Sequence, residues 1–364
     1  MKNQKRLLSI DVLRGMTIFF MIIVNDPGSW NYVYAPLEHA PWNGWTPTDL
    51  VFPFFVFIVG LSMSFSFRKF NNDKNQLIRK ILWRTAMIFL VGLLLNWYPF
   101  FNKSLTNLRL FGVLQRIALA YGFGALLCAF LNVRALIGAL IIILFGYWGI
   151  LLSTGVDDPL SLENNLVRSI DLMLFGENHI YHGYGIPFDP EGLLSTLPTI
   201  GTVILGFLTG KMIQSTDSNQ TKIINLIVIG PILIILAYIW QWLGFPINKP
   251  IWSISYVLLT AGLAMILFAL LLWLIDVKEW TGWTYIFRVF GLNPLAAFAL
   301  SGLIMKTFFL IKIGDQNLYG WLYSNVFQSI FRNYFGSFLQ ALTYTMFIWF
   351  FAWQLYIRNK VIKL

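Results

Sequence analysis

The chain has 364 residues, of which 57% are hydrophobic and only 12% are charged, and its mean hydropathy is +0.68. A water-soluble globular protein of this composition could not bury enough of its apolar surface, so we predict a polytopic membrane protein. The net charge of +10 does not indicate nucleic-acid binding, because Lys and Arg lie between apolar segments instead of in one patch. The one cysteine, Cys128, lies in an apolar run, and the three histidines are separated, which argues against a disulfide or a metal site.

Apolar runs of about 17 to 24 residues recur along the chain, and each is long enough for a helix to cross about 30 Å of hydrocarbon. They cover residues 8–25, 46–67, 80–98, 110–131, 135–153, 191–212, 222–242, 252–275, 284–304 and 337–357. Aromatic residues among polar ones over 318–335 predict a further helix at the membrane interface. We therefore predict an all-α fold, a polytopic bundle of about ten transmembrane helices that forms a single domain over residues 1–364.

The distribution of Lys and Arg predicts how the chain is oriented in the membrane. When the loops are assigned to alternate sides, most Lys and Arg residues fall on the side of the two termini, which is therefore predicted to be cytoplasmic. Two termini on the same side of the membrane require an even number of spans, which agrees with the count of ten. The long loops 26–45, 154–190 and 305–336 then face outward, and the first two contain all three histidines. The positively charged N-terminus favours a multi-pass protein of a bacterial cell inner membrane.

Charged residues inside the predicted spans are functional candidates, because an ionisable group at that depth costs a few kcal/mol. Asp11 and Arg14 are one helical turn apart and can pair with each other or extend toward the interface. They interrupt the start of the first run, which favours a retained span over a cleaved secretory signal. Asp49 and Arg116 are predicted at similar depth, where an ion pair, with Gln115 beside it, would explain how each charge is tolerated.

His39 lies in a loop that is rich in aromatic side chains. The aromatic residues of this loop are Trp30, Tyr32, Tyr34, Trp42 and Trp45. An isolated loop histidine is usually a surface or packing residue, but a loop folded back on the membrane surface can hold the imidazole as a general base. Glu38 either orients this histidine or is solvated. His179 and His182, in GENHIYHGYGIPFDPEGLLS, are either substrate contacts or structural residues of their loop.

Five motifs in the chain are distinctive in sequence and in order. They are RLLSIDVLRGMTIFFMIIVN (6–25), HAPWNGWTPTDLVFPFFVFIVG (39–60), GVLQR (112–116), FDPEGLLSTLPTIG (188–201) and NKPIWSISYVLLTAG (248–262). Together they resemble the heparan-alpha-glucosaminide N-acetyltransferase family of membrane acyltransferases. The resemblance spans most of the chain, and chance similarity between hydrophobic helices would not reproduce HAPWNGWT or FDPEG.

The resemblance implies transfer of an acetyl group from cytoplasmic acetyl-CoA to an amino sugar on the opposite face of the membrane. His39 aligns with the catalytic histidine of the family, and Asn25 aligns with an asparagine beside the reacting acetyl group. Asp49, Gln115 and Arg116 align with polar residues of the core site. The family tendency toward dimers implies a homodimer. The chain differs from lysosomal members in lacking their long lumenal N-terminal extension and in a slightly longer loop before His39, and these differences bear on the acceptor sugar.

The chemistry of the residues agrees with that implication. A protonated amine cannot attack a thioester until it loses a proton, and His39 would accept that proton. Asn25 would donate a hydrogen bond to the oxygen that becomes negative during the attack. His39 could instead take the acetyl group itself as a nucleophile, and the residues leave both routes open. Asp49 completes the predicted catalytic set.

The remaining candidates are divided between the two substrates. Residues predicted to bind acetyl-CoA, through its phosphates or along its pantetheine arm, are Arg6, Arg14, Arg84, Gln115 and Arg116. Residues predicted to contact the sugar are Asp189, Glu191, His182 and Trp42. No metal is required. An amino-sugar transporter remains an alternative, because it would also use many helices, buried charges and aromatic side chains. An O-acyltransferase of cell-envelope glycans is a second alternative, because it would use the same thioester chemistry with a hydroxyl as the attacking group.

Overall fold

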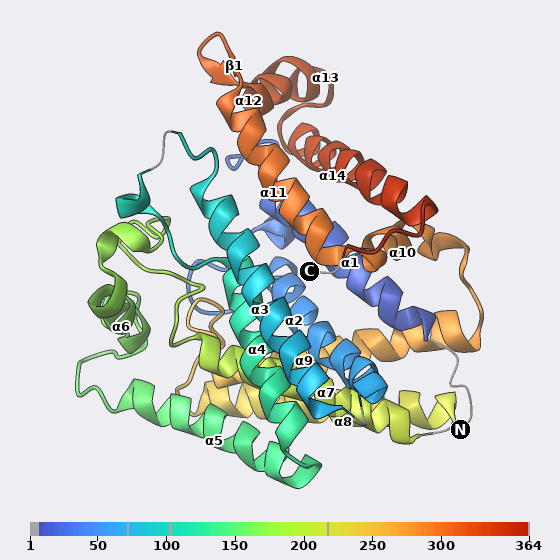
Figure 1. Cartoon of the computed structure of the whole chain (residues 1–364). Coiled ribbons are helices and arrows are strands. Elements are labelled where there is room, and N and C mark those ends of the chain that lie inside the picture. The colour runs from blue at the N-terminus through green and yellow to red at the C-terminus, as the bar shows by residue number, and fades with distance from the viewer. Residues whose placement is uncertain (1–6, 71–72, 102–103, 217, 363–364) are drawn as a thin grey trace. The chain divides into compact units, whose positions relative to one another are not determined.

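The computed structural model describes residues 7–70, 73–101, 104–216 and 218–362 (Figure 1). Almost all of the regular structure is helical, and a single two-stranded hairpin joins β1 (Lys312–Ile313) to β2 (Gln316–Asn317) within those residues. The chain divides into two compact units. Unit 1 contains the described residues up to Ala40, Thr46–Phe52 and those from Leu274 onward, and unit 2 contains Pro41–Trp45 and Pro53–Trp273.

Unit 1 is built around its first helix. Its helices are α1 (Leu8–Asn25), α10 (Tyr285–Leu292), α11 (Pro294–Leu310), α12 (Leu318–Leu322), α13 (Gln328–Phe331) and α14 (Asn333–Ile357), with a short 3-10 turn at Ala35–Leu37. The helix α1 packs on α10, α11 and α14. Two glycines bring α1 and α10 close, because a Cβ at Gly15 would lie 1.7 Å from the carbonyl oxygen of Phe287 and one at Gly291 would lie 2.2 Å from that of Asp11. Small residues of this kind allow close packing of membrane helices.

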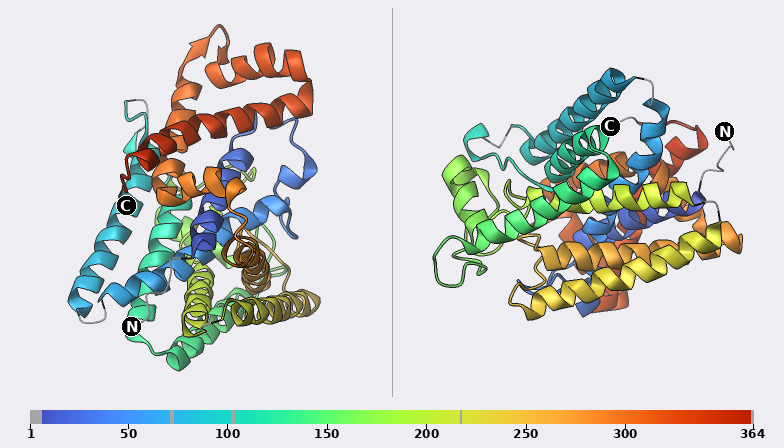
Figure 2. Two further views of the ribbon diagram at one scale, coloured as in Figure 1. Left: turned by 90° about the vertical axis from the view of Figure 1, so that its right-hand side faces the viewer. Right: turned by 90° about the horizontal axis from the view of Figure 1, so that it is seen from below.

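Unit 2 contains most of α2 and the seven helices that follow it. These elements are α2 (Pro47–Phe67), α3 (Lys74–Trp97), α4 (Val113–Phe130), α5 (Val133–Leu152), α6 (Leu166–Phe175), α7 (Thr196–Ser215), α8 (Asn219–Trp242) and α9 (Ile254–Leu271). A π-helical turn at Leu272–Val277 follows α9, and its residues from Leu274 onward belong to unit 1. The helix α7 is central, because it contacts α4, α5 and α9. It also meets α2 closely, since a Cβ at Gly60 would lie 2.0 Å from the carbonyl oxygen of Val203. The helices α8 and α9 lie side by side (Figure 2).

The all-α membrane bundle predicted from composition is confirmed, and each of the ten predicted segments is helical. Eight helices among the described residues are long and apolar enough to cross a membrane, and a bent pair can supply a ninth crossing. That pair, Gly282–Leu292 and Pro294–Leu310, corresponds to the predicted run 284–304 and turns by 77° where a proline begins the second helix. The predicted run 80–98 lies in α3, whose N-terminal half carries Lys74, Arg79, Lys80 and Arg84.

Helices also occupy the segment predicted to lie at the membrane interface. There α12, a π-helical turn at Tyr323–Phe327 and α13 follow one another. The cytoplasmic position of the termini and the single-domain assignment stay predictions.

Candidate functional site

The N-terminus of α2 holds the carboxylate of Asp49 in a capping arrangement. The sequence Thr46-Pro47-Thr48-Asp49 places a proline in the first helical turn and an acidic side chain three residues after the threonine. One carboxylate oxygen of Asp49, Oδ2, accepts hydrogen bonds from the backbone N–H of Thr46 at 3.1 Å, from the Thr46 hydroxyl at 3.2 Å and from the backbone N–H of Ala40 at 3.0 Å. Asp49 is only 1% exposed, so these donors replace water around a buried charge.

The other oxygen of Asp49 meets His39. The distance from His39 Nδ1 to Asp49 Oδ1 is 2.6 Å, and the histidine side chain is 41% exposed while the aspartate is buried. Because a carboxylate only accepts, Nδ1 carries a proton and donates it to this bond, and in the neutral ring the lone pair is then on Nε2. The pair therefore has the arrangement of a general base that a carboxylate orients.

Hydrogen bonds from the first turn of α2 also shape the loop around the histidine. The Thr46 hydroxyl lies 2.6 Å from the carbonyl oxygen of Glu38, so its one proton is shared between this oxygen and Oδ2 of Asp49. The Thr48 hydroxyl donates to the carbonyl oxygen of Pro36 at 3.2 Å. Glu38 contributes through its backbone, and Asp49 is the carboxylate that contacts the imidazole. Sequence reasoning did not predict the contact between His39 and Asp49, although the Thr46-x-x-Asp49 spacing could have indicated that this carboxylate turns back toward the preceding loop.

Asn25 is the last residue of α1 and is exposed. The next residue, Asp26, is tied to α12, because its carbonyl oxygen accepts a hydrogen bond from the Tyr319 hydroxyl at 2.7 Å. Burial raises the pKa of the Asp26 carboxyl to about 8, so it is mostly protonated at neutral pH. The role predicted for Asn25 stays a prediction.

A second polar cluster lies in unit 2, around the FDPEG motif. Arg109 binds Asp189 with two hydrogen bonds, from Nε at 2.9 Å and from Nη2 at 2.7 Å, and Nη2 also contacts Glu191 at 2.6 Å. The guanidinium lies over the ring of Tyr181, 4.6 Å from its centroid. Asp189 is fully buried and Glu191 is partly exposed. Two-point pairing of this kind fixes the geometry of the loop as well as neutralising its charge.

Arg116 is buried beneath that loop, beside the equally buried Gln115. Its Nη2 donates to the hydroxyl of Ser195 and, at 3.4 Å, to the carbonyl oxygen of Gly192. Its guanidinium also lies 5.1 Å from the ring centroid of Trp252. Asp49 lies in unit 1 and Arg116 in unit 2, so the predicted ion pair between them stays a prediction.

Comparison with known proteins gives one consistent family. The sequence model of "Heparan-alpha-glucosaminide N-acetyltransferase, catalytic" matches residues 6–238, which is more than half of the chain. The chain belongs to this family. It is 29% identical to the human heparan-alpha-glucosaminide N-acetyltransferase over 350 residues, covering 80% of this chain and 52% of the human protein. The mouse protein of the same name is 29% identical over 372 residues, covering 86% of this chain and 56% of the mouse protein. The chain thus spans about half the length of these relatives.

In this member of the acetyltransferase family, the predicted acetyl-CoA residues are spread over several helices. Arg14 contacts Asp11 at 3.3 Å, which confirms that pair, and donates to the carbonyl oxygen of Gly291 at 3.2 Å. Arg84 lies over the ring of Tyr121, 4.9 Å from its centroid. Arg6 lies outside the described residues. Nε of Arg84, Nε2 of Gln115 and Nε of Arg116 are buried donors without a hydrogen-bond partner in the part of the chain that the structure describes.

The predicted sugar contacts outside the FDPEG motif have different surroundings. Trp42 donates its indole N–H to the carbonyl oxygen of Leu160 at 3.0 Å and packs against the ring of Phe188. His182 is exposed. His179 places Nδ1 2.7 Å from the carbonyl oxygen of Leu108, so this histidine links two loops of unit 2. Among the described residues, no group of three or more His, Cys, Asp or Glu side chains could hold a metal ion.

Gly192 allows the FDPEG loop to pass over a buried acid. A Cβ at this position would lie 1.7 Å from Oδ2 of Asp171, whose other oxygen accepts the N–H of Leu193 at 3.0 Å. We expect Gly192→Ala to destabilise the protein by about 1–3 kcal/mol because the alanine would displace this carboxylate. The thermal unfolding midpoint in detergent measures the loss. Gly138→Ala is the control, since nothing lies within 4 Å of a Cβ there; equal midpoints for the two variants would contradict the prediction.

Asp171 should also make stability depend on pH. Burial raises its pKa to about 7, and within the described structure Oδ2 has no hydrogen-bond partner. Because this pKa lies above the value of about 3.9 in an unfolded chain, the residue favours the folded state at low pH, and that contribution is lost as the pH rises through 7. Three pKa units correspond to roughly 4 kcal/mol as an upper limit. Asp171→Asn should therefore flatten the decline of the unfolding midpoint between about pH 4 and 7; parallel pH curves for the variant and the wild type would refute this.

Proposed function

We propose that this protein is a transmembrane N-acetyltransferase that moves an acetyl group from acetyl-CoA to the amine of a glucosamine-type sugar, with His39 as the general base. The names of the family and of the human and mouse relatives support the reaction class and the sugar class. The observation that carries the proposal in this chain is the 2.6 Å contact between a partly exposed imidazole and a buried carboxylate.

The proposed reaction uses each of these groups once. Nε2 of His39 accepts a proton from the sugar amine, and the nitrogen lone pair attacks the thioester carbonyl carbon. Asp49 stabilises the imidazolium that forms, and Asn25 donates a hydrogen bond to the developing oxyanion. Collapse of the tetrahedral intermediate breaks the carbon–sulfur bond, and the imidazolium returns its proton to the departing thiolate. The nitrogen releases its remaining extra proton to water, which completes the neutral amide. A two-step route, in which Nε2 first takes the acetyl group, uses the same exposed nitrogen.

Acetyl-CoA, the second substrate, is proposed to accept hydrogen bonds from buried donors of unit 2. Acetyl-CoA carries amide carbonyls along its pantetheine arm and phosphates at its other end, so it is rich in hydrogen-bond acceptors. The unpartnered N–H groups of Arg84, Gln115 and Arg116 match that chemistry, since a buried donor without an acceptor is costly. Arg14 is proposed as a further contact near the cytoplasmic end of α1. Asp189 and Glu191 are proposed to support the sugar site, Asp189 through its pairing with Arg109 and Glu191 through its partly exposed carboxylate.

Sidedness and product can be tested together. The protein is reconstituted in vesicles, acetyl-CoA labelled in the acetyl group is supplied on one side, and glucosamine is supplied on the other. The proposal expects label in an amide bond on the glucosamine side, and loss of that product with His39→Ala. Glucosamine uptake without acetylation would favour the transporter, and label in an ester would favour an O-acyltransferase.

Cross-linking in the same vesicles tests the predicted homodimer, and fractionation of cells tests the predicted inner-membrane location.

A further inference from the structure

The threonine that precedes α2, Thr46, is linked to both sides of the contact between His39 and Asp49. Its hydroxyl lies 2.6 Å from the carbonyl oxygen of Glu38, the residue directly before the histidine, and 3.2 Å from Oδ2 of Asp49. Its backbone N–H donates to the same Oδ2 at 3.1 Å. The reaction proposed above gives Thr46 no part, although this one side chain joins the two segments that carry the pair.

The contact with Glu38 restrains the backbone of the histidine. The carbonyl group of Glu38 and the N–H of His39 belong to one peptide unit, which is planar and resists rotation. A hydrogen bond that holds this carbonyl oxygen therefore also holds the nitrogen of His39. On the other side of the histidine, the N–H of Ala40 donates to Oδ2 of Asp49 at 3.0 Å. Both peptide units that flank the histidine are thus held, the first by Thr46 and the second by Asp49.

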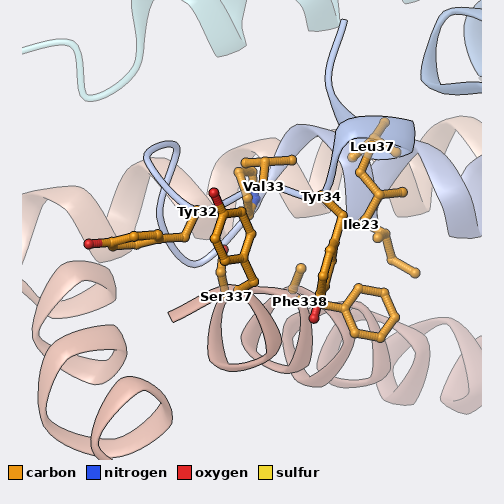
Figure 3. A pocket seen from close by; sticks show the side chains of 11 residues that line it. Ile23, Tyr32, Val33, Tyr34, Leu37, Ser337 and Phe338 are labelled. Carbon is orange, nitrogen blue, oxygen red and sulfur yellow. The ribbon is translucent and has the colours of Figure 1, made fainter. Parts of the chain in front are cut away.

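Packing holds the segment that leads to Glu38. Leu37 ends a 3-10 turn and, together with Val33, lines a shallow groove between the loop that follows α1 and the start of α14 (Figure 3). The chain therefore reaches Glu38 from a fixed direction. The hydroxyl of Thr46 then restrains the one peptide unit that remains before His39.

The contact with Asp49 orients the acid. The two carboxylate oxygens lie in one plane, so donors that hold Oδ2 also set the direction of Oδ1, which lies 2.6 Å from Nδ1 of His39. Donors to Oδ2 include the N–H of Ala40 and both the N–H and the hydroxyl of Thr46. The hydroxyl shares its single proton with the carbonyl oxygen of Glu38. It therefore couples the position of the carboxylate to that of the imidazole.

We propose that Thr46 is a positioning residue for the acetyl transfer, because its hydroxyl sets the orientation of the His39 ring relative to the Asp49 carboxylate. This inference rests on the function proposed above and adds a residue to its machinery. The rate of a catalysed step depends steeply on geometry, and a misplacement of about 1 Å can cost about 10²-fold. Thr46 acts through the pair and contacts no substrate in this proposal.

A threonine at the N-terminus of a helix can also serve only the stability of that helix. Thr284 supplies the matched control for this role. Its buried hydroxyl donates to the carbonyl oxygen of Thr281 at 2.6 Å at the N-terminus of α10, and within the described residues it makes no hydrogen bond with His39 or Asp49. Thr284→Val thus removes a comparable hydroxyl that is not linked to the pair.

Steady-state kinetics with labelled acetyl-CoA and glucosamine provide the first test. Thr46→Val keeps the backbone N–H and the size of the side chain, and we expect it to lower kcat by about 10- to 100-fold while the KM for acetyl-CoA changes by less than about twofold. Thr46→Ser keeps the hydroxyl and should retain kcat within about threefold of the wild type. Thr284→Val should retain the wild-type kcat. A folded Thr46→Val protein with the wild-type kcat, or a serine variant as slow as the valine variant, would overturn the proposal.

Combination with His39→Ala separates positioning from a general structural role. If Thr46 acts through the imidazole, His39→Ala/Thr46→Val should have the same residual kcat as His39→Ala. A further fall, by the factor that Thr46→Val causes in the wild-type background, would contradict the proposal. Thr46→Ala replaces the valine variant if that variant does not fold. Failure of both to fold, beside a folded Thr284→Val protein, would assign the hydroxyl to folding and also overturn the proposal.

Chemical modification decides the proposal without acetyl transfer. If the wild type acetylates no sugar, the proposed function fails, but diethyl pyrocarbonate, which acylates an unprotonated imidazole nitrogen, still reports the state of His39. Mass spectrometry of peptides follows each histidine separately, and the exposed His182 is the internal reference. Thr46→Val should slow the modification of His39 at least about threefold relative to that of His182, because a less oriented ring has its lone pair on Nε2 less often. Equal relative rates in the variant and the wild type would refute the positioning role.

Discussion

His39→Ala is expected to lower kcat for acetyl transfer by about 10² to 10⁴, the range that a positioned general base contributes. The substrate amine is mostly protonated near neutral pH, and the variant has no group at this position to accept its proton. The KM for acetyl-CoA should change little, because the imidazole belongs to the chemical step. Steady-state kinetics of purified protein, with labelled acetyl-CoA and glucosamine, measures both constants.

Added imidazole provides the control for this variant. The alanine leaves a space beside Asp49, and free imidazole in that space can accept the proton, so the rate should rise with imidazole concentration in the variant and not in the wild type. An unfolding midpoint equal to that of the wild type would show that the loss is chemical. A folded His39→Ala protein with full activity would eliminate the histidine as either base or nucleophile.

Asp49→Asn is expected to lower kcat by about 10² to 10⁴ and also to destabilise the protein by about 1–3 kcal/mol. The carboxylate accepts hydrogen bonds from Thr46 and Ala40 while its other oxygen contacts the imidazole. An asparagine must turn its NH₂ group either toward those donors or toward Nδ1 of His39. The first choice leaves the loop N–H groups unpaired, and the second favours the tautomer whose proton is on Nε2, which cannot act as a base.

Asp73→Asn is a suitable comparison for this substitution. Asp73 caps the N-terminus of α3, where it accepts the N–H of Gln76 at 2.8 Å, and within the described residues it makes no hydrogen bond with His39 or Asp49. Its replacement should cost little stability, because asparagine is also a good N-cap, and should leave kcat unchanged. Comparable kcat values for Asp49→Asn and Asp73→Asn would argue against an orienting role for Asp49.

The two polar clusters are expected to differ in their effect on catalysis, because they have different chemistry. The Asp49 cluster satisfies a buried carboxylate with donors from its own loop, and its imidazole remains partly exposed. The Arg109 cluster neutralises Asp189 in full burial. We therefore propose that the first cluster carries the proton transfer and that the second positions the FDPEG loop.

The positions of the helices could be predicted from sequence, because each helix depends on the hydropathy of its own segment. An apolar run of adequate length must satisfy its own backbone hydrogen bonds in hydrocarbon, so α1, α5 and α8 lie close to the boundaries read from hydropathy. The break before Pro294 has a local cause too, but the 77° turn there depends on what the two helices pack against. His39 was predicted as the base from its aromatic loop and from family resemblance, and this role stays a prediction.

The sequence by itself determined the all-helical membrane architecture and the family, and the role of His39 as a proton acceptor stays a prediction. Only the tertiary structure decided which partners the polar residues have. Arg109 pairs with Asp189 across 80 positions, and Tyr34 meets Tyr334 across most of the chain. Hydropathy and spacing record which residues must leave water, but they do not record which buried donor meets which acceptor, because that pairing depends on how distant helices pack.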